Sequence, residues 1–352
     1  AAKQYKNELG KPLFVIPGNH EASLNTLDLF YKNFGSPTYT FTYGETRFIM
    51  LNSAYRQSIN TSDPTQYQYL QDILKQNTSP NVYIVNHVIT RDHYYTEHNM
   101  TAEEAKKFEG ILSSYKAKNP NKNVTVLFGH LHTLDNWQVG GVNYIIGGNA
   151  AGKGYVTHDQ GNLLGYGTIT VKNGVAQYAF NPYLTAVYLK NDALIGNTIK
   201  VFKSARIQMD LYGDFRESPD DYMTQLNSHE LVDIAWSSSD PNIVSVDQHG
   251  VIMAKSLGTA NITAVSGGKS STVSVNVLDA SDAKVTKLEM ALPQSVKVGQ
   301  TVIPTVKGTD AYGTVFALNN KDIEFTFKNG LMSAIDGTLR ALKTGQETVI
   351  AK

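Results

Sequence analysis

The sequence contains no cysteine among its 352 residues, which excludes disulfide bonds and thiolate-ligated metal sites. It also lacks an apolar run of the roughly 18 to 20 residues that a membrane-spanning helix needs. Neither sign of charge predominates, because 31 lysines and arginines balance 31 aspartates and glutamates, and no basic block is present. We therefore expect neither a nucleic-acid partner nor a membrane span.

The pattern of the sequence changes near residue 182, and 352 residues are too many for one ordinary hydrophobic core. From residue 12 to about 180, short apolar runs alternate with helical segments, which is typical of an α/β domain. Beyond that point, alternation rich in serine, threonine and valine, with frequent turn residues, is typical of a β-sandwich. We predict domains at residues 1–183, 184–280 and 281–352.

The first region predicts buried strands and two helices. Asp63 and Pro64 are suited to open one helix as its cap and first residue. Thr101 and Glu104 predict a capping box at the start of the other. The predicted strands are Leu13–Ile16, Arg47–Leu51, Val82–Val85, Val124–Phe128, Tyr144–Ile146, Gly167–Val171 and Val175–Phe180.

Two stretches of the later region repeat each other in outline. Residues 247–264 recur as residues 334–351, and the matched positions are Gly250 with Gly337, Ala254 with Ala341, and Gly258 with Gly345. Gly250 and Gly337 suit a hairpin turn with positive φ, and Gly258 and Gly345 suit a second turn. The matched alanines suit a tight inward position. We expect two copies of one β module, the second of which stops where its last strand should follow.

Polar side chains that can bind metal follow three of the predicted strands. They are Gly18-Asn19-His20-Glu21, His87 and Gly129-His130-Leu131-His132. The glycines permit close backbone approach, and the spacing of His130 and His132 predicts two imidazoles on one side of an extended segment. Imidazole and amide oxygen suit manganese, iron or zinc. Each histidine taken singly would more often be an ordinary surface or hydrogen-bonded residue.

The ordered set resembles the calcineurin-like metallophosphoesterases, over roughly residues 12 to 180. The resemblance implies a β-sandwich flanked by helices, of four-layer αββα type with its first strands missing, that hydrolyses phosphate esters with two divalent ions. It implies Asn19, His87 and His130 as ligands of one ion and His132 as a ligand of the other. Residues 234–264 closely resemble the bacterial Ig-like group 2 family.

The same resemblance implies roles for two further residues. His20 would lie over the substrate, where a protonated imidazole stabilises charge and protonates the leaving oxygen. Glu21 would support the ligands from behind them, and an acidic charge at a helix N-terminus is an equally good interpretation.

The resemblance also has a gap. The family's Asp-x-His and Gly-Asp motifs should precede Gly18, yet residues 1–17 contain neither aspartate nor histidine. We expect residue 1 to lie inside a longer polypeptide. This chain alone should be inactive and hold at most one ion, weakly.

Four residues are candidates for the mouth of the site, because loops after strands often determine specificity. Arg91, His93 and His98 follow the His87 strand, and an exposed polar loop is the alternative interpretation. His158 lies in a glycine-rich stretch after Gly147, Gly148 and Asn149, where a backbone nest would bind phosphate. An ordinary turn is the alternative there.

Two functions fit these observations. The first is a secreted or wall-associated enzyme of a bacterium, of the Gram-positive type, that hydrolyses phosphomonoesters or phosphodiesters. Its Ig-like modules would act as spacer or anchor and contact cell-wall or surface carbohydrate; nucleotides, teichoic-acid-like diesters and phosphorylated sugars are all candidate substrates. The second is a surface adhesion or scaffold protein whose phosphoesterase-like domain is inert. A metal-dependent peptidase is disfavoured because the sequence contains no His-Glu-x-x-His.

Overall fold

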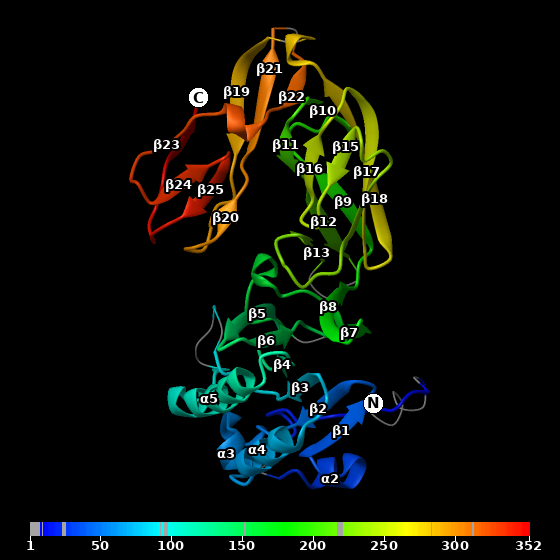
Figure 1. The fold of residues 1–352 in the computed structure, drawn as a ribbon, viewed down its shortest axis with the longest axis vertical. Coiled ribbons are helices and arrows are strands. Elements are labelled where there is room, and N and C mark those ends of the chain that lie inside the picture. The colour runs from blue at the N-terminus through cyan, green and yellow to red at the C-terminus, as the bar shows by residue number, and fades with distance from the viewer. Residues whose placement is uncertain are drawn as a thin grey trace. The chain divides into compact units, whose positions relative to one another are not determined.

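The computed structural model describes residues 8, 10–22, 26–91, 93–94, 98–150, 153–216, 221–282, 284–311 and 313–352. The chain divides into two compact units, Ala1–Pro182 and Tyr183–Lys352. Among the described residues, α-helices occur in the first unit and strands in both (Figure 1). Within that described part, no helix is long and apolar enough to cross a membrane.

A six-stranded sheet forms the centre of the first unit, in the order β1-β2-β3-β4-β6-β5. Four inner strands run parallel, and the two edge strands, β1 and β5, are antiparallel to their neighbours. Because the parallel strands end at the same edge of the sheet, the residues that follow them gather there. The strands are β1 Tyr39–Tyr43, β2 Thr46–Met50, β3 Asn81–Val85, β4 Asn123–Phe128, β5 Leu134–Val139 and β6 Val142–Gly147.

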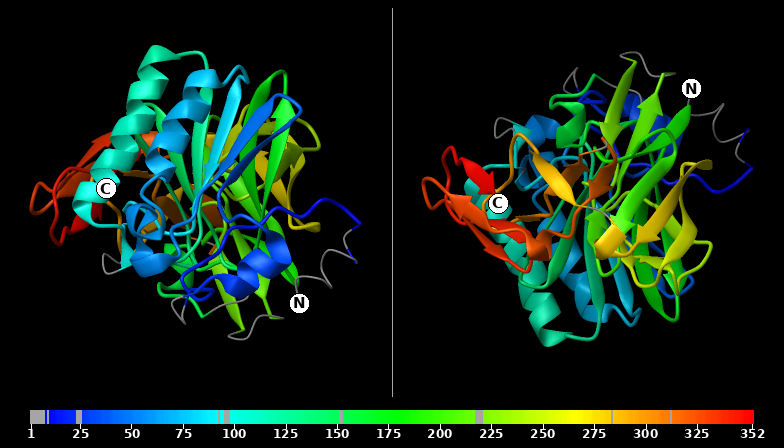
Figure 2. Two further views of the ribbon diagram at one scale, coloured as in Figure 1. Left: turned by 90° about the horizontal axis from the view of Figure 1, so that it is seen from below. Right: turned by 90° about the horizontal axis from the view of Figure 1, so that it is seen from above.

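Two helices cover one face of this sheet, α4 (Gln66–Gln76) and α5 (Ala102–Lys118) (Figure 2). Their apolar residues form one buried cluster with the strands, because both helices repeat apolar side chains at helical spacing. The helical members of the cluster include Tyr67, Leu70, Leu74, Phe108 and Leu112. Shorter helical segments are α2 Asp28–Phe34, α3 Ile59–Ser62 and a 3₁₀ turn at Tyr55–Gln57.

Both helix starts differ in detail from prediction. Thr101 Oγ1 accepts a hydrogen bond from the Glu104 N–H at 3.3 Å, but Glu104 does not bond back to complete the box. Its carboxylate instead accepts from the Asn60 N–H at 2.8 Å and the Tyr67 hydroxyl at 3.0 Å, so a tertiary contact replaces the local one. Helix α4 begins at Gln66 rather than at Pro64, after a turn in which the Asp63 carboxylate accepts from the Thr65 N–H at 2.9 Å and the Asp63 carbonyl from the Gln66 N–H at 3.2 Å.

A hairpin of β7 (Gly165–Lys172) and β8 (Val175–Pro182) covers the other face of the sheet (Figure 2). Asn81 at the start of β3 holds it, since its Oδ1 accepts from the Ala176 N–H and its Nδ2 donates to the Gly174 carbonyl, both at 2.9 Å. The Tyr178 hydroxyl donates to the Gly147 carbonyl at 3.3 Å. The hairpin is therefore joined to the sheet by specific polar contacts.

The predicted strand Leu13–Ile16 is wrong. No described segment forms a backbone ladder with residues 12–18, which contact β1 through its side chains. The Phe14 ring stacks on Phe41 with centroids 3.8 Å apart, and the Tyr39 hydroxyl donates to the Val15 carbonyl at 2.8 Å. An apolar run becomes a strand only where a neighbouring backbone satisfies its N–H and C=O groups.

The second unit is built on a seven-stranded sheet, in the order β14-β17-β18-β10-β22-β21-β19. Strand β10 lies in its middle and pairs in parallel with both β18 and β22, so this sheet crosses the predicted boundary at residue 280. The strands are β9 Ala186–Lys190, β10 Thr198–Phe202, β11 Arg206–Gln208, β12 Asp210–Phe215, β13 Tyr222–Gln225, β14 Ala235–Ser238, β15 Val244–Val246, β16 Val251–Ala254, β17 Gly258–Ser266, β18 Lys269–Leu278, β19 Val285–Ala291, β20 Thr301–Val302, β21 Thr305–Asp310, β22 Val315–Ala317, β23 Phe325–Phe327, β24 Met332–Ile335, β25 Thr338–Ala341 and β26 Val349–Ala351.

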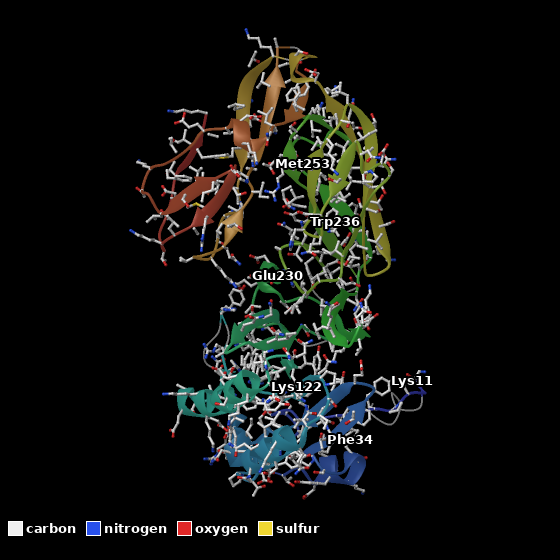
Figure 3. The ribbon with its side chains drawn as sticks, in the orientation of Figure 1. Lys11, Phe34, Lys122, Glu230, Trp236 and Met253 are labelled. Carbon is white, nitrogen blue, oxygen red and sulfur yellow. The ribbon has the colours of Figure 1, made fainter. Side chains whose placement is uncertain are left out.

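The matched glycines and alanines of the two repeats have the same geometry. Each repeat contains a hairpin, β15 with β16 in the first and β24 with β25 in the second. Its turn glycine has φ of 83° at Gly250 and 75° at Gly337, and the later glycines have φ of 129° and 147°. The alanines between them are buried. At Gly250 the ring of Trp236 also packs so closely that a Cβ would lie 2.6 Å from its Cζ2. Figure 3 labels Trp236 among the strands of the second unit.

Candidate metal centre

Asn19, His87 and His130 meet at the edge of the sheet where its parallel strands end. His87 follows β3, His130 follows β4, and a turn at residues 18–22 carries Asn19. Asn19 Oδ1 lies 2.9 Å from His87 Nε2 and 3.1 Å from His130 Nδ1. Two ligand atoms about 2.1 Å from one ion, at a right angle, are about 3.0 Å apart. Both distances are hydrogen-bond lengths, and they also equal the spacing of two ligands at a right angle about one ion.

Glycines border the His87 ring on two sides. A Cβ on Gly18 would lie 2.9 Å from His87 Cε1, and one on Gly129 would lie 3.3 Å from His87 Nδ1. Glu21 closes the turn at Gly18, because its carboxylate accepts from the Gly18 N–H at 2.8 Å and its own N–H donates to the Gly18 carbonyl at 3.2 Å. Glu21 thus lies in a turn rather than at a helix start, and it shapes the backbone that presents Asn19.

The segment from His130 to His132 is not extended, so that prediction is wrong. His130 has φ of 69° and His132 has φ of 53°, a left-handed conformation that residues other than glycine rarely adopt. His130 is buried and turns toward Asn19. His132 turns away, and its Nδ1–H donates to the Lys153 carbonyl at 2.8 Å. The two left-handed residues therefore direct the imidazoles to different partners.

The buried imidazoles are neutral at physiological pH. Burial lowers the pKa of His87 to about 4, although the nearby Glu21 charge opposes the shift. Burial likewise lowers the pKa of His130 to about 3, and the neighbouring His87 lowers it further. The exposed His20 contributes to both shifts, so it lies within electrostatic reach of the pair. The imidazole nitrogens that face Asn19 Oδ1 act as hydrogen-bond donors to it, and each would have to give up that proton before it could bind a metal ion.

The donors fit part of the shell of one divalent ion. In the part of the chain that the structure describes, no group of three or more His, Cys, Asp or Glu side chains could hold a metal. The cluster consists of two imidazoles and one amide oxygen. His132 is the predicted ligand of a second ion, and its Nδ1 is hydrogen-bonded to the Lys153 carbonyl. The described residues therefore do not fit a complete two-ion site.

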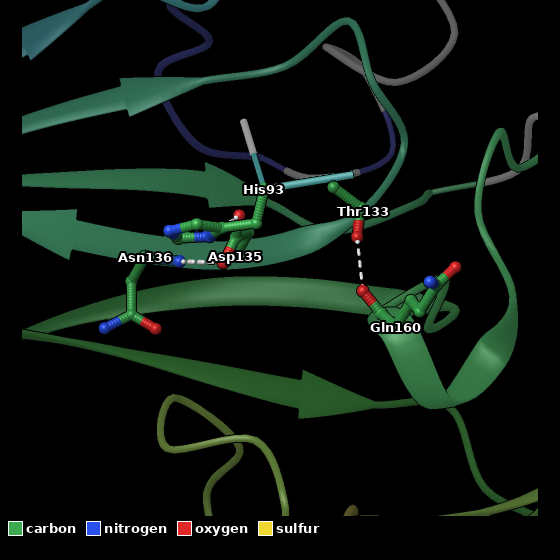
Figure 4. Close-up of polar contacts among 5 residues, drawn as sticks. All are labelled: His93, Thr133, Asp135, Asn136 and Gln160. Carbon is green, nitrogen blue, oxygen red and sulfur yellow. Dashed lines mark hydrogen bonds and ion pairs between the residues drawn. The ribbon is translucent and has the colours of Figure 1, made fainter. Parts of the chain in front are cut away.

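Two of the predicted mouth residues are tied to the scaffold, Arg91 by an ion pair and His93 by a hydrogen bond. The Arg91 guanidinium contacts both carboxylate oxygens of Glu109 on α5, with Nε donating to Oε1 at 3.0 Å. His93 Nδ1 lies 2.6 Å from Asp135 Oδ2 at the start of β5 (Figure 4). Both carboxylates are buried, whereas the Arg91 and His93 side chains are 54% and 42% exposed. These pairs anchor the loop that follows β3.

His98, from the same loop, contacts the candidate centre. Its Nδ1 lies 3.3 Å from His130 Nε2. The Tyr155 ring packs against it at a centroid distance of 4.8 Å and against His132 at 5.4 Å. Tyr155 therefore lies between the two histidines.

His158 lies in an ordinary turn. Its Nδ1–H donates to the Asn162 carbonyl at 2.9 Å, and the turn is held to the centre by the Thr133 hydroxyl, which donates to the Gln160 carbonyl at 3.0 Å (Figure 4). The N–H groups of Gly148 and Asn149 donate to the carbonyls of Thr133 and Leu163, and residues 151–152 of the same glycine-rich stretch lie outside the described residues.

Sequence reasoning missed Asp135, Lys153 and Tyr155. Asp135 had a weak signal, because it lies three residues after His132 at a strand start. Lys153 contributes a backbone carbonyl, which has no sequence signature, and Tyr155 lies 23 positions beyond His132 in a turn.

Two family models match the chain. The model described as calcineurin-like phosphoesterase matches residues 1–134, and that described as bacterial Ig-like domain (group 2) matches residues 222–277. The chain contains a calcineurin-like phosphoesterase segment followed by a bacterial Ig-like domain. This confirms both resemblances and the fold class, a partial phosphoesterase domain followed by Ig-like β modules. The phosphoesterase family acts on phosphate esters and generally uses divalent metals.

Individual proteins are also similar to parts of the chain. An uncharacterized protein of Clostridium acetobutylicum is 34% identical over 125 residues, which are 34% of this chain and 12% of that protein. The chain thus spans about an eighth of the length of this curated relative. Among solved structures, GAP50, the anchor in the inner membrane complex of Plasmodium, matches with 12% identity and a TM-score of 0.32, covering 42% of this chain and 50% of that one. Domains 4–9 of the surface layer protein SbsC match with 17% identity and a TM-score of 0.33, covering 51% and 31%.

Proposed function

We propose that the phosphoesterase domain hydrolyses phosphate esters at a metal centre in which Asn19, His87 and His130 hold one divalent ion. The observation that supports this most directly is the convergence of two neutral imidazole nitrogens on one amide oxygen, at 2.9 and 3.1 Å. Manganese, iron and zinc suit such ligands. A bound ion would polarise the phosphoryl oxygens and activate a water molecule.

The surrounding residues have separate tasks in this proposal. Glu21 and Gly18 shape the turn so that the Asn19 amide oxygen faces the imidazoles. His20 is exposed beside them, in a suitable place to protonate the leaving oxygen of the substrate. His132 donates from Nδ1 to a carbonyl, which fixes its tautomer and leaves Nε2 as the ligand atom for a second ion.

The remaining ligands of that second ion would be those of the family's Asp-x-His and Gly-Asp motifs. We further propose that the full-length protein is extracellular or attached to a bacterial cell wall of the Gram-positive type. The Ig-like modules would serve as spacer or anchor and contact surface carbohydrate. The matched Ig-like family supports this placement.

An inert scaffold is the second candidate function. It is favoured by one observation: the described donors complete neither one ion's shell nor a two-ion site. The domain would then keep the phosphoesterase fold without hydrolysing phosphate esters.

Hydrolysis assays separate the two candidates. The 352-residue chain and the full-length protein are incubated with Mn²⁺ and either bis-para-nitrophenyl phosphate or the corresponding monoester. We expect the chain to be inactive and the full-length protein to turn over at least one substrate, with a loss of at least about 100-fold in His87→Ala and His130→Ala. His249→Ala, in an exposed turn of the second unit, is the matched control. Undiminished turnover in either site variant would overturn the ligand assignment, and an inactive full-length protein would favour the scaffold.

A further inference from the structure

His98 contacts His130 on the side opposite to the candidate ion. His130 Nδ1 faces Asn19, and its other nitrogen, Nε2, lies 3.3 Å from His98 Nδ1. The two rings have centroids 5.2 Å apart and are tilted by 56°. The loop that carries His98 is closed beside it, because Ile89 and Asn99 form a β-bridge and the Met100 N–H donates to the Ile89 carbonyl at 2.9 Å. The backbone thus holds His98 next to the proposed ligand.

The two tautomers of His130 need opposite partners at Nε2. When its Nδ1–H donates to Asn19, as the 3.1 Å distance allows, Nε2 has no proton and must accept a hydrogen bond. When the Nδ1 lone pair is given to an ion, Nε2 holds the proton and must donate. A carboxylate in the position of His98 could only accept, and a lysine could only donate. An imidazole nitrogen can do either, because its own tautomer can change.

We propose that His98 is a positioning residue that orients the His130 ring through a hydrogen bond with His130 Nε2. His98 donates this hydrogen bond in the ion-free state and accepts it in the ion-bound state. The inference rests on the proposed function, since it takes His130 as a ligand. In the ion-free chain, His98 Nδ1–H donates to His130 Nε2 and His130 Nδ1–H donates to Asn19. In the ion-bound chain, His98 Nδ1 accepts from His130 Nε2–H.

The change between these states conserves protons. The proton on His98 Nδ1 moves along the hydrogen bond to His130 Nε2, and the proton on His130 Nδ1 leaves to water. His98 Nε2 then takes a proton from water. Each imidazole holds the same number of protons before and after, so the exchange itself adds no charge to the pocket.

Tyr155 supports the His98 ring and suggests a matched pair of variants. Its ring packs against His98 at 4.8 Å, so an aromatic replacement at position 98 keeps that contact. His98→Phe retains the ring and removes both hydrogen-bonding nitrogens. His98→Gln loses the ring but supplies an amide that flips between donor and acceptor. Comparison of the two variants separates the effect of the hydrogen bond to His130 from the effect of ring packing against Tyr155.

The first test is nitrogen-15 NMR of the metal-free 352-residue chain. We expect His98 to carry its proton on Nδ1, against the preference of a free imidazole side chain for Nε2. In His130→Phe, which removes the acceptor, His98 should revert to the Nε2–H form. An Nε2–H form of His98 in the metal-free wild-type chain would overturn the proposal.

The second test is the affinity for Co²⁺, followed by its visible absorption and by calorimetry. We expect His98→Phe to bind Co²⁺ about 10- to 100-fold more weakly and His98→Gln to stay within about threefold of the wild type. Equal binding by His98→Phe and the wild type, or equal losses in both variants, would overturn the proposal. If the wild-type chain binds no Co²⁺, the ligand set of the proposed function fails, and the NMR test still decides the role of His98.

Discussion

The Asp135 carboxylate lies 2.6 Å from His93 Nδ1, although the two residues are 42 positions apart in the sequence. Their pair joins the loop after β3 to the start of β5, and the pair of Arg91 with Glu109 joins the same loop to α5. Each pair consists of a buried carboxylate and a partly exposed nitrogen-bearing partner. The loop that carries His98 is therefore anchored at two points.

Replacing Asp135 should loosen this loop. Asp135→Ala removes the acceptor for His93 and should lower the free energy of unfolding by about 1 to 2 kcal/mol. Asp135→Asn keeps an oxygen that accepts from Nδ1–H, so it should lose less. Urea denaturation followed by circular dichroism measures both values. Equal losses in the two variants would contradict the hydrogen-bond explanation.

Removing Arg91 should cost more than removing both members of its ion pair. Arg91→Ala leaves the Glu109 carboxylate buried and unpaired, and it should lower the free energy of unfolding by about 2 kcal/mol, a value reduced because Arg91 is half exposed. Adding Glu109→Gln removes the unpaired charge and should restore part of the loss. The same denaturation experiment checks this, and a double variant no more stable than Arg91→Ala would refute it.

Two glycine-to-alanine changes should have opposite effects. In Gly18→Ala the new Cβ would lie 2.9 Å from His87 Cε1, so the ring must move and Co²⁺ binding should weaken by about tenfold or more. Gly110→Ala, in the middle of α5, meets no atom within 4 Å and should raise the free energy of unfolding by about 0.5 to 1 kcal/mol. Calorimetric titration with Co²⁺ and urea denaturation check the pair. Unchanged Co²⁺ binding in Gly18→Ala would contradict this prediction, because it would show that the His87 ring accommodates the added Cβ.

The second unit should become less stable as the pH rises from about 4 to above 6. Burial, with a smaller contribution from the Asp192 charge, raises the pKa of Asp210 to about 6, while Gln225 Nε2 donates to its Oδ1 at 2.9 Å. The raised pKa means that the folded state favours the protonated form, so stability is full below pH 4 and falls as the pH passes 6. Asp210→Asn keeps the acceptor oxygen and removes the charge. It should raise the free energy of unfolding at pH 7 by on the order of 2 kcal/mol and leave it unchanged near pH 4. Urea denaturation of both proteins across this pH range measures the effect. The same pH dependence in Asp210→Asn and in the wild type would contradict the assignment to Asp210.

Short apolar runs were enough to predict the parallel strands. The predicted Val82–Val85 and Val124–Phe128 differ from β3 and β4 by one residue at the start. The similar run Leu13–Ile16 forms no strand, because pairing depends on a neighbour that the run itself does not specify.

The site was predictable to the same degree. The order and residue types of Asn19, His87 and His130 pointed to their convergence, since parallel strands bring their ends together. The left-handed backbone at His130 and His132 was not predictable, because the apolar run before it suggested continued extension. Long-range pairs such as His93 with Asp135 depend on how a loop folds back over the sheet, which local patterns do not encode.

Strand β10 gives the second unit an uneven response to mechanical tension. It pairs with β18 along its whole length, from Thr198 to Phe202, but with β22 through the single pair Val201 and Ala317, beside the stacked rings of Phe202 and Phe316. A pulling force on the two ends of this unit must shear the long ladder all at once, whereas the short joint yields after one pair separates. The unit should therefore lengthen first at the joint between β10 and β22, and the strands on either side of it should stay folded while it does so.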